Sequence, residues 1–77
     1  MEFNIWIRSF QEVQEFIKLA TVQPFRVIVG NEFQSANATG IMGLVSLDHR
    51  HPLRVSADCG EEEFALFRQQ AARFAVE

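Results

Sequence analysis

Two hydrophobic periods alternate along this chain of 77 residues, and their order limits the fold more than any other feature. Apolar residues at every second position are typical of half-buried strands, whereas apolar residues three and four positions apart are typical of helices. The pattern predicts strands at 2–7, 25–29, 33–36 and 53–57 and helices at 10–21, 40–47 and from 58 to the C-terminus. The βαββαβα order predicts an α+β fold, a four-stranded antiparallel sheet with three helices on one face.

The predicted helix starts carry capping signals. Ser9 is followed three residues later by Glu12, the spacing of a capping box, and Asp58 and Glu61 repeat that spacing before the last helix. The apolar positions that face inward in this scheme form the predicted core: Phe3, Ile5, Val13, Ile17, Val27, Leu53, Val55, Phe64 and Phe67.

The chain is short enough that residues 1–77 are expected to form a single domain with one core. Hydrophobic residues make up 48% of it, with eight Phe, which is ample for that core. The single Cys59 cannot close an internal disulfide, as is usual in a reducing cytoplasm. The sequence has neither a signal-peptide pattern nor a membrane-spanning apolar segment, so we expect a cytoplasmic protein without membrane contact.

Charge and size exclude several classes of function. Seven Lys and Arg against ten Asp and Glu give a net charge of −3, which argues against binding to nucleic acid. A chain of this size has no second wall or lid with which to enclose a large substrate. We therefore expect neither an enzyme nor a cofactor.

The run Asn37-Ala38-Thr39-Gly40-Ile41-Met42-Gly43-Leu44-Val45-Ser46-Leu47 resembles the segment around the second helix of HPr, the histidine phosphocarrier of the sugar phosphotransferase system. In both, an Asn, a helix N-cap and Ile-Met-Gly fall between the third and fourth strands. The order of elements is also similar over nearly the whole chain. The resemblance implies that residues 1–77 form the HPr-like open-faced β-sandwich.

The phosphorylation positions of that family are not kept. In HPr, the phosphoryl group is carried by a histidine at the start of the first helix, followed by Ala-Arg-Pro. Aligned from the Ile-Met-Gly motif, this chain has Ser9 at the histidine, then Phe10, Gln11 and Glu12. The regulatory serine before Ile-Met-Gly is Gly40 here, which has no hydroxyl. The chain therefore resembles a divergent member that has lost both sites.

The chemistry of the replacements agrees with this interpretation. A phosphate ester on Ser9 would not pass its phosphoryl group on as a phosphoramidate of histidine does. Gln11 replaces a charged guanidinium by a neutral amide, and Glu12 places a carboxylate where phosphate would sit. We also interpret Ser9 as a helix cap rather than a kinase target.

The two histidines lie in the run Asp48-His49-Arg50-His51 after the second helix. The first interpretation is that they are solvated loop residues. A metal site with Asp48 is a second, but no third ligand is identifiable, so no metal is predicted. The resemblance adds a third, because in HPr this loop lies near the phosphorylation centre. His49 or His51 could then replace the lost histidine.

Two other reactive-looking features have ordinary structural interpretations. Cys59 near a helix start could be a reactive thiol, but a half-buried inert cysteine is the expected state. The acidic run 61–63 lies in the first turn of the last helix, where negative charge is favourable, and needs no partner.

An apolar surface is the strongest functional signal. Ile41, Met42 and Val45 cannot all face one core from a helix of two turns. The resemblance implies that the matching HPr positions dock enzyme partners, and Phe10 would extend this surface. The leading hypothesis is therefore a non-phosphorylatable protein-binding or regulatory module, whose partner is a protein of the phosphotransferase or catabolite-control type.

Two alternatives remain open at this stage. One is a phosphocarrier with a displaced site at His49 or His51. The other is a structural homodimer through the uncovered sheet face, where Trp6 and Ile28 are expected because they alternate out of phase with the core. A monomer or a weak homodimer is expected.

Overall fold

The computed structural model describes residues 1–76, in which strands and helices follow one another in the predicted α+β order, with one strand added at the end. The strands are β1 (Glu2–Ile5), β2 (Val27–Gly30), β3 (Ser35–Asn37), β4 (Leu53–Ala57) and β5 (Ala75–Val76). The helices are α1 (Phe10–Thr21), α2 (Ile41–Val45) and α3 (Glu61–Gln70).

The strands form one antiparallel sheet in the order β3-β2-β4-β1-β5. The central pairs place Phe3 opposite Val55 and Val29 opposite the same Val55, so apolar residues of three neighbouring strands line up across one face. Residues on the alternate positions point to the other face. In β1, for example, Ile5 is buried and Asn4 is exposed.

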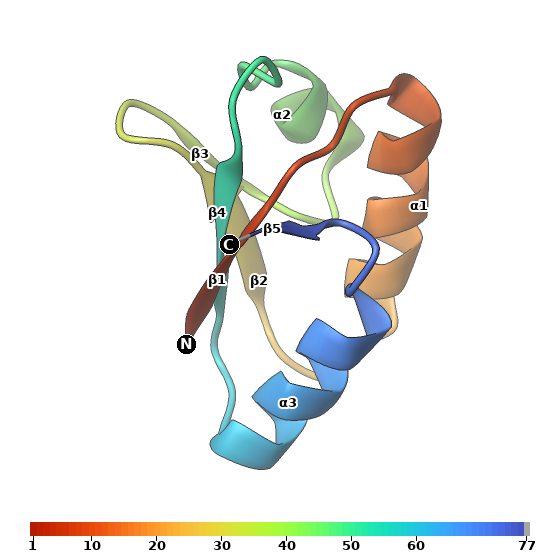
Figure 1. The fold of residues 1–77 in the computed structure, drawn as a ribbon, viewed down its shortest axis with the longest axis vertical. Coiled ribbons are helices and arrows are strands. Elements are labelled where there is room, and N and C mark those ends of the chain that lie inside the picture. The colour runs from red at the N-terminus through yellow and green to blue at the C-terminus, as the bar shows by residue number, and fades with distance from the viewer. Residues whose placement is uncertain (77) are drawn as a thin grey trace.

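The three helices of residues 1–76 lie on one side of the sheet, as predicted (Figure 1). α1 and α3 cover the face, and α2 sits across the upper end in this view, where it contacts α1 and β3. The other face is uncovered. Within the described residues, no helix is long and apolar enough to cross a membrane.

The core lies between the sheet and the helices, and most of the predicted core residues are buried in it. Phe67 of α3 is its aromatic centre, with ring centroids 5.8 Å from Phe3 and 5.6 Å from Phe25. Phe16 of α1 is equally buried, although it was not among the predicted core residues. The buried hydrophobic residues are Phe3, Ile5, Ile7, Val13, Phe16, Ala20, Val27, Val29, Ala38, Leu44, Leu47, Leu53, Val55, Ala57, Phe67, Ala71 and Phe74.

Two predicted core residues, Ile17 and Phe64, are only half-buried at the edge of this cluster. Each lies beside a fully buried residue of its own helix, Phe16 and Phe67 respectively, which occupies the centre of the helical face. The apolar stripe was therefore predicted in the right helices, but its centre is shifted.

The prediction of four strands is wrong, because the described chain contains five. The last helix was expected to continue to the C-terminus, but it ends at Gln70. Turns then bring Phe74 into the core, and its carbonyl accepts a hydrogen bond from the Trp6 amide at 2.8 Å. β5 follows and pairs with β1, Ile5 opposite Ala75. The sequence pattern did not predict this change of direction, because Phe74 falls at a spacing that is also typical of a continuing helix.

The predicted start of the last helix is also shifted. The N-cap is Gly60 rather than Asp58, and its amide donates to the Glu63 carboxylate at 3.5 Å. This is the reciprocal half of a capping box, which needs no side chain on the cap residue itself. The acidic residues 61–63 lie in the first turn, as predicted.

Phe67→Ala should lower the free energy of unfolding by about 3–5 kcal/mol, because truncation of a buried Phe leaves a cavity. This loss is comparable to the whole stability expected of so small a protein. Phe64→Ala should cost only about 1–2 kcal/mol, since part of its ring is already in water. Urea denaturation followed by Trp6 fluorescence measures both, and equal losses would contradict the assignment of Phe67 as the centre of the core.

Candidate functional site

The N-terminus of α1 is capped by the side chains of Ser9 and Glu12. The Ser9 hydroxyl oxygen accepts a hydrogen bond from the Glu12 amide at 3.2 Å, which confirms the predicted cap. The Glu12 side chain folds back, and its Oε1 accepts from the Arg8 amide at 2.7 Å. A helix N-terminus attracts anions through its free N–H groups and dipole. Here Glu12 already supplies that negative charge.

The position of α2 is set by Gly43. A Cβ on this residue would lie 2.9 Å from the Ala36 Cβ of β3, so the helix can approach the strand this closely only with glycine there. Leu44 beside it is fully buried. The opposite side of the short helix therefore faces solvent, and the Met42 side chain is 80% exposed.

Four exposed apolar side chains lie on α2 and at the start of α1. Val45 and Phe10 line one cavity of about 260 Å³ between the two helices. Ile41 lies one turn before Val45 on α2, and Met42 follows it. We call these four residues, Phe10, Ile41, Met42 and Val45, the α1–α2 patch; all four are exposed.

His49 lies at the same cavity and fastens the loop that follows α2. Its Nε2 is 2.7 Å from the Leu44 carbonyl oxygen at the end of α2, a contact in which the ring N–H donates. Its own carbonyl accepts a hydrogen bond from the Trp6 indole Nε1 at 3.1 Å. The other ring nitrogen, Nδ1, is buried and has no hydrogen-bond partner within residues 1–76.

The structure separates the two histidines that the sequence left as alternatives. His49 lines the cavity together with Ser9, which the HPr resemblance aligns with the histidine of that family. His51 is exposed and lines a different cavity, together with Phe33. Gly40, which the HPr resemblance aligns with the regulatory serine of that family, is the exposed N-cap of α2.

Two residues of the cavity were not predicted as site residues, Arg8 and Val13. Val13 is a core residue whose place one turn after Phe10 could have indicated that it also touches the surface there. Arg8 places its guanidinium 4.8 Å from the centroid of the Trp6 ring. No periodic pattern marks this contact, because it depends on how the chain leaves β1.

The uncovered sheet face is largely polar. Ile28 does point to that face, but it lies opposite Ser56 on one side and Asn37 on the other. Trp6 lies beyond the end of β1 and is half-buried beneath the loop that holds His49. The apolar surface expected for a homodimer through this face is therefore reduced to one strand residue between polar neighbours.

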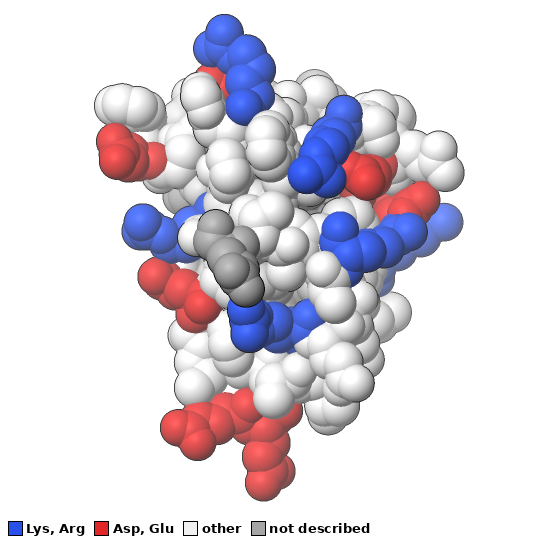
Figure 2. All heavy atoms as spheres, in the orientation of Figure 1, with Lys and Arg blue, Asp and Glu red and all other residues white. Residues whose placement is uncertain are grey.

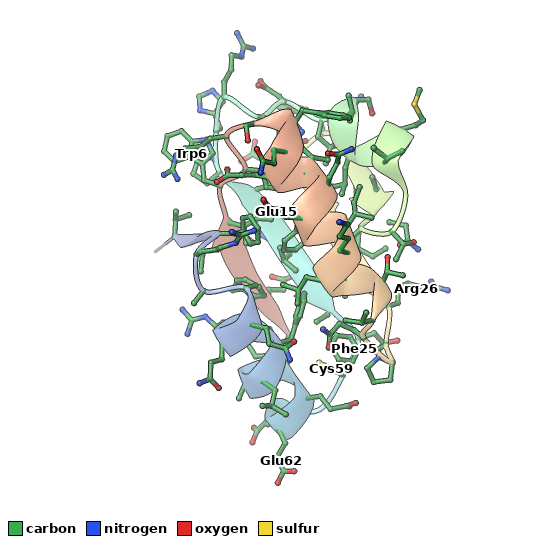
Figure 3. All side chains as sticks on the ribbon, turned by 90° about the vertical axis from the view of Figure 1, so that its right-hand side faces the viewer. Trp6, Glu15, Phe25, Arg26, Cys59 and Glu62 are labelled. Carbon is green, nitrogen blue, oxygen red and sulfur yellow. The ribbon has the colours of Figure 1, made fainter. Side chains whose placement is uncertain are left out.

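The remaining sequence candidates lie at the other end of the molecule. Figure 2 shows acidic side chains at the lower end, where α3 begins in Figure 1. Cys59 lies near Phe25 toward that end, away from Trp6 (Figure 3). The Cys59 thiol is half-buried, and burial raises its pKa, aided by the nearby Glu63 carboxylate. No cluster of metal-ligating side chains occurs in the part of the chain that the structure describes.

Comparison with known proteins gives a likeness of structure but not of sequence. No protein-family model matches the chain. No curated protein sequence matches it either. Among solved structures, the crystal structure of HPr-C-His from Thermoanaerobacter tengcongensis matches 95% of this chain and 91% of its own, with a TM-score of 0.73 and 21% sequence identity.

The likeness shows the fold. This chain has the HPr-like fold that the sequence resemblance implied, with five strands in the described residues where four were expected.

The loop after α2 carries an ion pair with a measurable pH dependence. Hydrogen bonds from the Arg50 side chain, and then from its amide, lower the pKa of Asp48 from 3.8 to about 2. The ionised Asp48 carboxylate stabilises the folded loop through its pair with Arg50. This contribution is fully present above pH 3.8 and is lost as the pH falls through about 2, where the carboxylate becomes protonated.

We therefore expect the Asp48 carboxyl carbon to titrate with a midpoint near 2 in ¹³C NMR. In Arg50→Gln, the midpoint should move up toward 3.8, since the charged donor is lost. A wild-type Asp48 midpoint already at 3.8 would contradict the ion pair.

Proposed function

We propose that residues 1–77 form a single HPr-like domain that binds a protein and does not itself carry phosphate. In this proposal, the α1–α2 patch docks a protein of the phosphotransferase or catabolite-control type, without a cofactor. The observation that supports it is a cavity lined by exposed Phe10 of α1 and exposed Val45 of α2, with Ile41 and Met42 exposed on the same short helix.

The patch has the physical character of a binding surface. Clustered apolar side chains gain most from being covered, and interface centres are rich in aromatic residues and Met. Phe10 supplies a ring that is 57% exposed. Met42 supplies a flexible thioether that can adapt its shape to a partner. Because Leu44 and Gly43 hold α2 in place, the patch is presented on a fixed surface.

The loss of carrier chemistry follows from the start of α1. The Ser9 hydroxyl caps the helix, and Glu12 already lies at the N-terminus where a phosphate would need free N–H groups. Bringing a phosphate there would place two negative charges side by side. HPr homologues interact with proteins of the phosphotransferase system, and this supports a protein partner of related type.

Met42→Asp should abolish partner capture without unfolding the protein. The side chain is 80% exposed, so the free energy of unfolding should change by less than about 0.5 kcal/mol. In the centre of an interface, the unpaired carboxylate should cost more than about 2 kcal/mol of binding. Affinity capture from a lysate of the source organism, with denaturation curves for both proteins, measures the two effects.

Leu66→Asp provides a matched control for that experiment. Leu66 is 61% exposed on α3 and is not part of the α1–α2 patch. This variant should keep every partner that the wild type captures. The proposal fails if Met42→Asp keeps the same partners, or if Leu66→Asp loses them equally.

A displaced phosphocarrier is the second candidate, and one observation favours His49 over His51 for it. Only His49 shares the cavity with Ser9, and its Nε2 is held by Leu44, so Nδ1 is left as the ring nitrogen with a free lone pair. That nitrogen is buried, so the ring would have to leave its contact with Leu44 before a phosphoryl donor could reach it.

Incubation with phosphoenolpyruvate and the general phosphotransferase enzyme should leave the chain unlabelled, and so should ATP with the serine kinase that modifies HPr. The reasons are the capped Ser9 and the missing hydroxyl at Gly40. Labelling is measured by mass spectrometry, with an authentic HPr as the positive control. Acid-labile phosphate that is lost in His49→Ala but kept in His51→Ala would instead establish the displaced carrier.

A further inference from the structure

A second cavity, of about 400 Å³, lies on the uncovered face of the sheet. Asn4, Arg54 and Gly30 line it from three neighbouring strands, since Arg54 is opposite both Asn4 and Gly30 in the register. The loop with His51 and the turn with Phe33 complete the lining. None of its lining residues belongs to the cavity of the α1–α2 patch, so any role it has goes beyond the proposed docking function.

The turn between β2 and β3 holds Phe33 out into solvent. Its side chain is 88% exposed, the most exposed of the large hydrophobic residues in the described chain. The Asn31 carboxamide oxygen accepts hydrogen bonds from the Phe33 amide at 2.8 Å and from the Gln34 amide at 2.9 Å. A Cβ at Gly30 would lie 2.6 Å from the Gln34 carbonyl, so this tight turn requires glycine. An aromatic ring is thus presented by an ordered turn.

Three charged residues line the cavity, Asp48, Glu32 and Arg54, and they differ in how firmly they are paired. Asp48 is bound by Arg50, with Nε and Nη2 each at 3.0 Å. Within residues 1–76, in contrast, Glu32 makes no ion pair, and the nearest carboxylate oxygen to Arg54 is that of Glu2 at 3.9 Å. Glu32 and Arg54 do not pair with each other, although they line the same cavity.

We infer that this cavity binds a zwitterionic small molecule with a flat apolar group, the chemistry of a free aromatic amino acid. The Arg54 guanidinium is shaped to donate two parallel hydrogen bonds to a carboxylate. Glu32 accepts from the ammonium group, and the Phe33 ring packs against the flat side chain. A purely anionic ligand would meet Glu32, and a purely cationic one would meet Arg54.

The size of the cavity agrees with this class of ligand. Sites for small molecules commonly enclose about 300–1,000 Å³, and this cavity lies near the lower limit of that range. The Asn4 carboxamide and the Asn31 amide nitrogen add polar groups for orientation, because the Asn31 oxygen is already used in the turn.

The test is an NMR titration of the isotope-labelled protein with L-phenylalanine, 3-phenylpropanoate and phenethylamine. The second probe lacks the ammonium group and the third lacks the carboxylate. L-phenylalanine should give saturable shifts at the amides of Gly30, Phe33 and Arg54. Each of the other probes should bind roughly tenfold more weakly or worse, because one charge-assisted contact is lost.

Variants with matched controls complete the experiment. Arg54→Gln and Glu32→Gln should each weaken L-phenylalanine binding by roughly tenfold, whereas Arg68→Gln and Glu62→Gln on α3 should leave it unchanged. The inference is overturned if no saturable shift occurs at millimolar ligand, if the three probes bind equally, or if the cavity variants behave as the controls do. None of these results bears on partner capture by the α1–α2 patch, whose tests use other residues.

Discussion

The packing of Phe67 against rings from three other parts of the chain is the interaction on which the rest of the structure depends. Its ring meets Phe3 of β1, Phe16 of α1 and Phe25 just before β2. The contacts with Phe3 and Phe25 are edge-to-face and the one with Phe16 is tilted. Such contacts bury large apolar surfaces and also fix the relative orientation of the rings. Because α1 and α3 are held on one sheet face in this way, α2 is left at the upper end, where its outer side stays in water (Figure 1).

The end of the fold that holds α2 has the HPr-like arrangement. The HPr-like arrangement places the start of α1 beside α2 and its following loop. At that point the described residues present a capped serine, a folded-back carboxylate and an apolar rim. This combination of groups is the basis of the proposed docking function. The polar cavity around Arg54 lies on the opposite, uncovered face and has a different chemistry.

Much of the fold was predictable because its signals are local. The helix from Phe10 to Thr21 and the strand from Leu53 to Ala57 match their predicted bounds, since apolar period and capping are written in neighbouring residues. The last strand was missed because Phe74 continues the helical spacing, and only its packing in the core shows that the chain has turned back. Similarly, the sequence predicted Asp58 as the N-cap of the last helix, whereas the structure has Gly60 there. Glycine has no side chain that would mark it as a capping residue in the sequence.

In the candidate site, too, some features could be predicted from neighbouring residues and others required the tertiary structure. The sequence by itself determined which residues stand at the two positions that the HPr resemblance aligns with phosphorylation sites, Ser9 and Gly40. It also determined the surplus of apolar residues on a helix too short to bury them. Only the tertiary structure decided that His49 rather than His51 shares the cavity with Ser9, and that Glu32 and Arg54 line a common cavity. Residues distant in the chain meet through strand register and helix packing, and these depend on the whole core rather than on any local pattern.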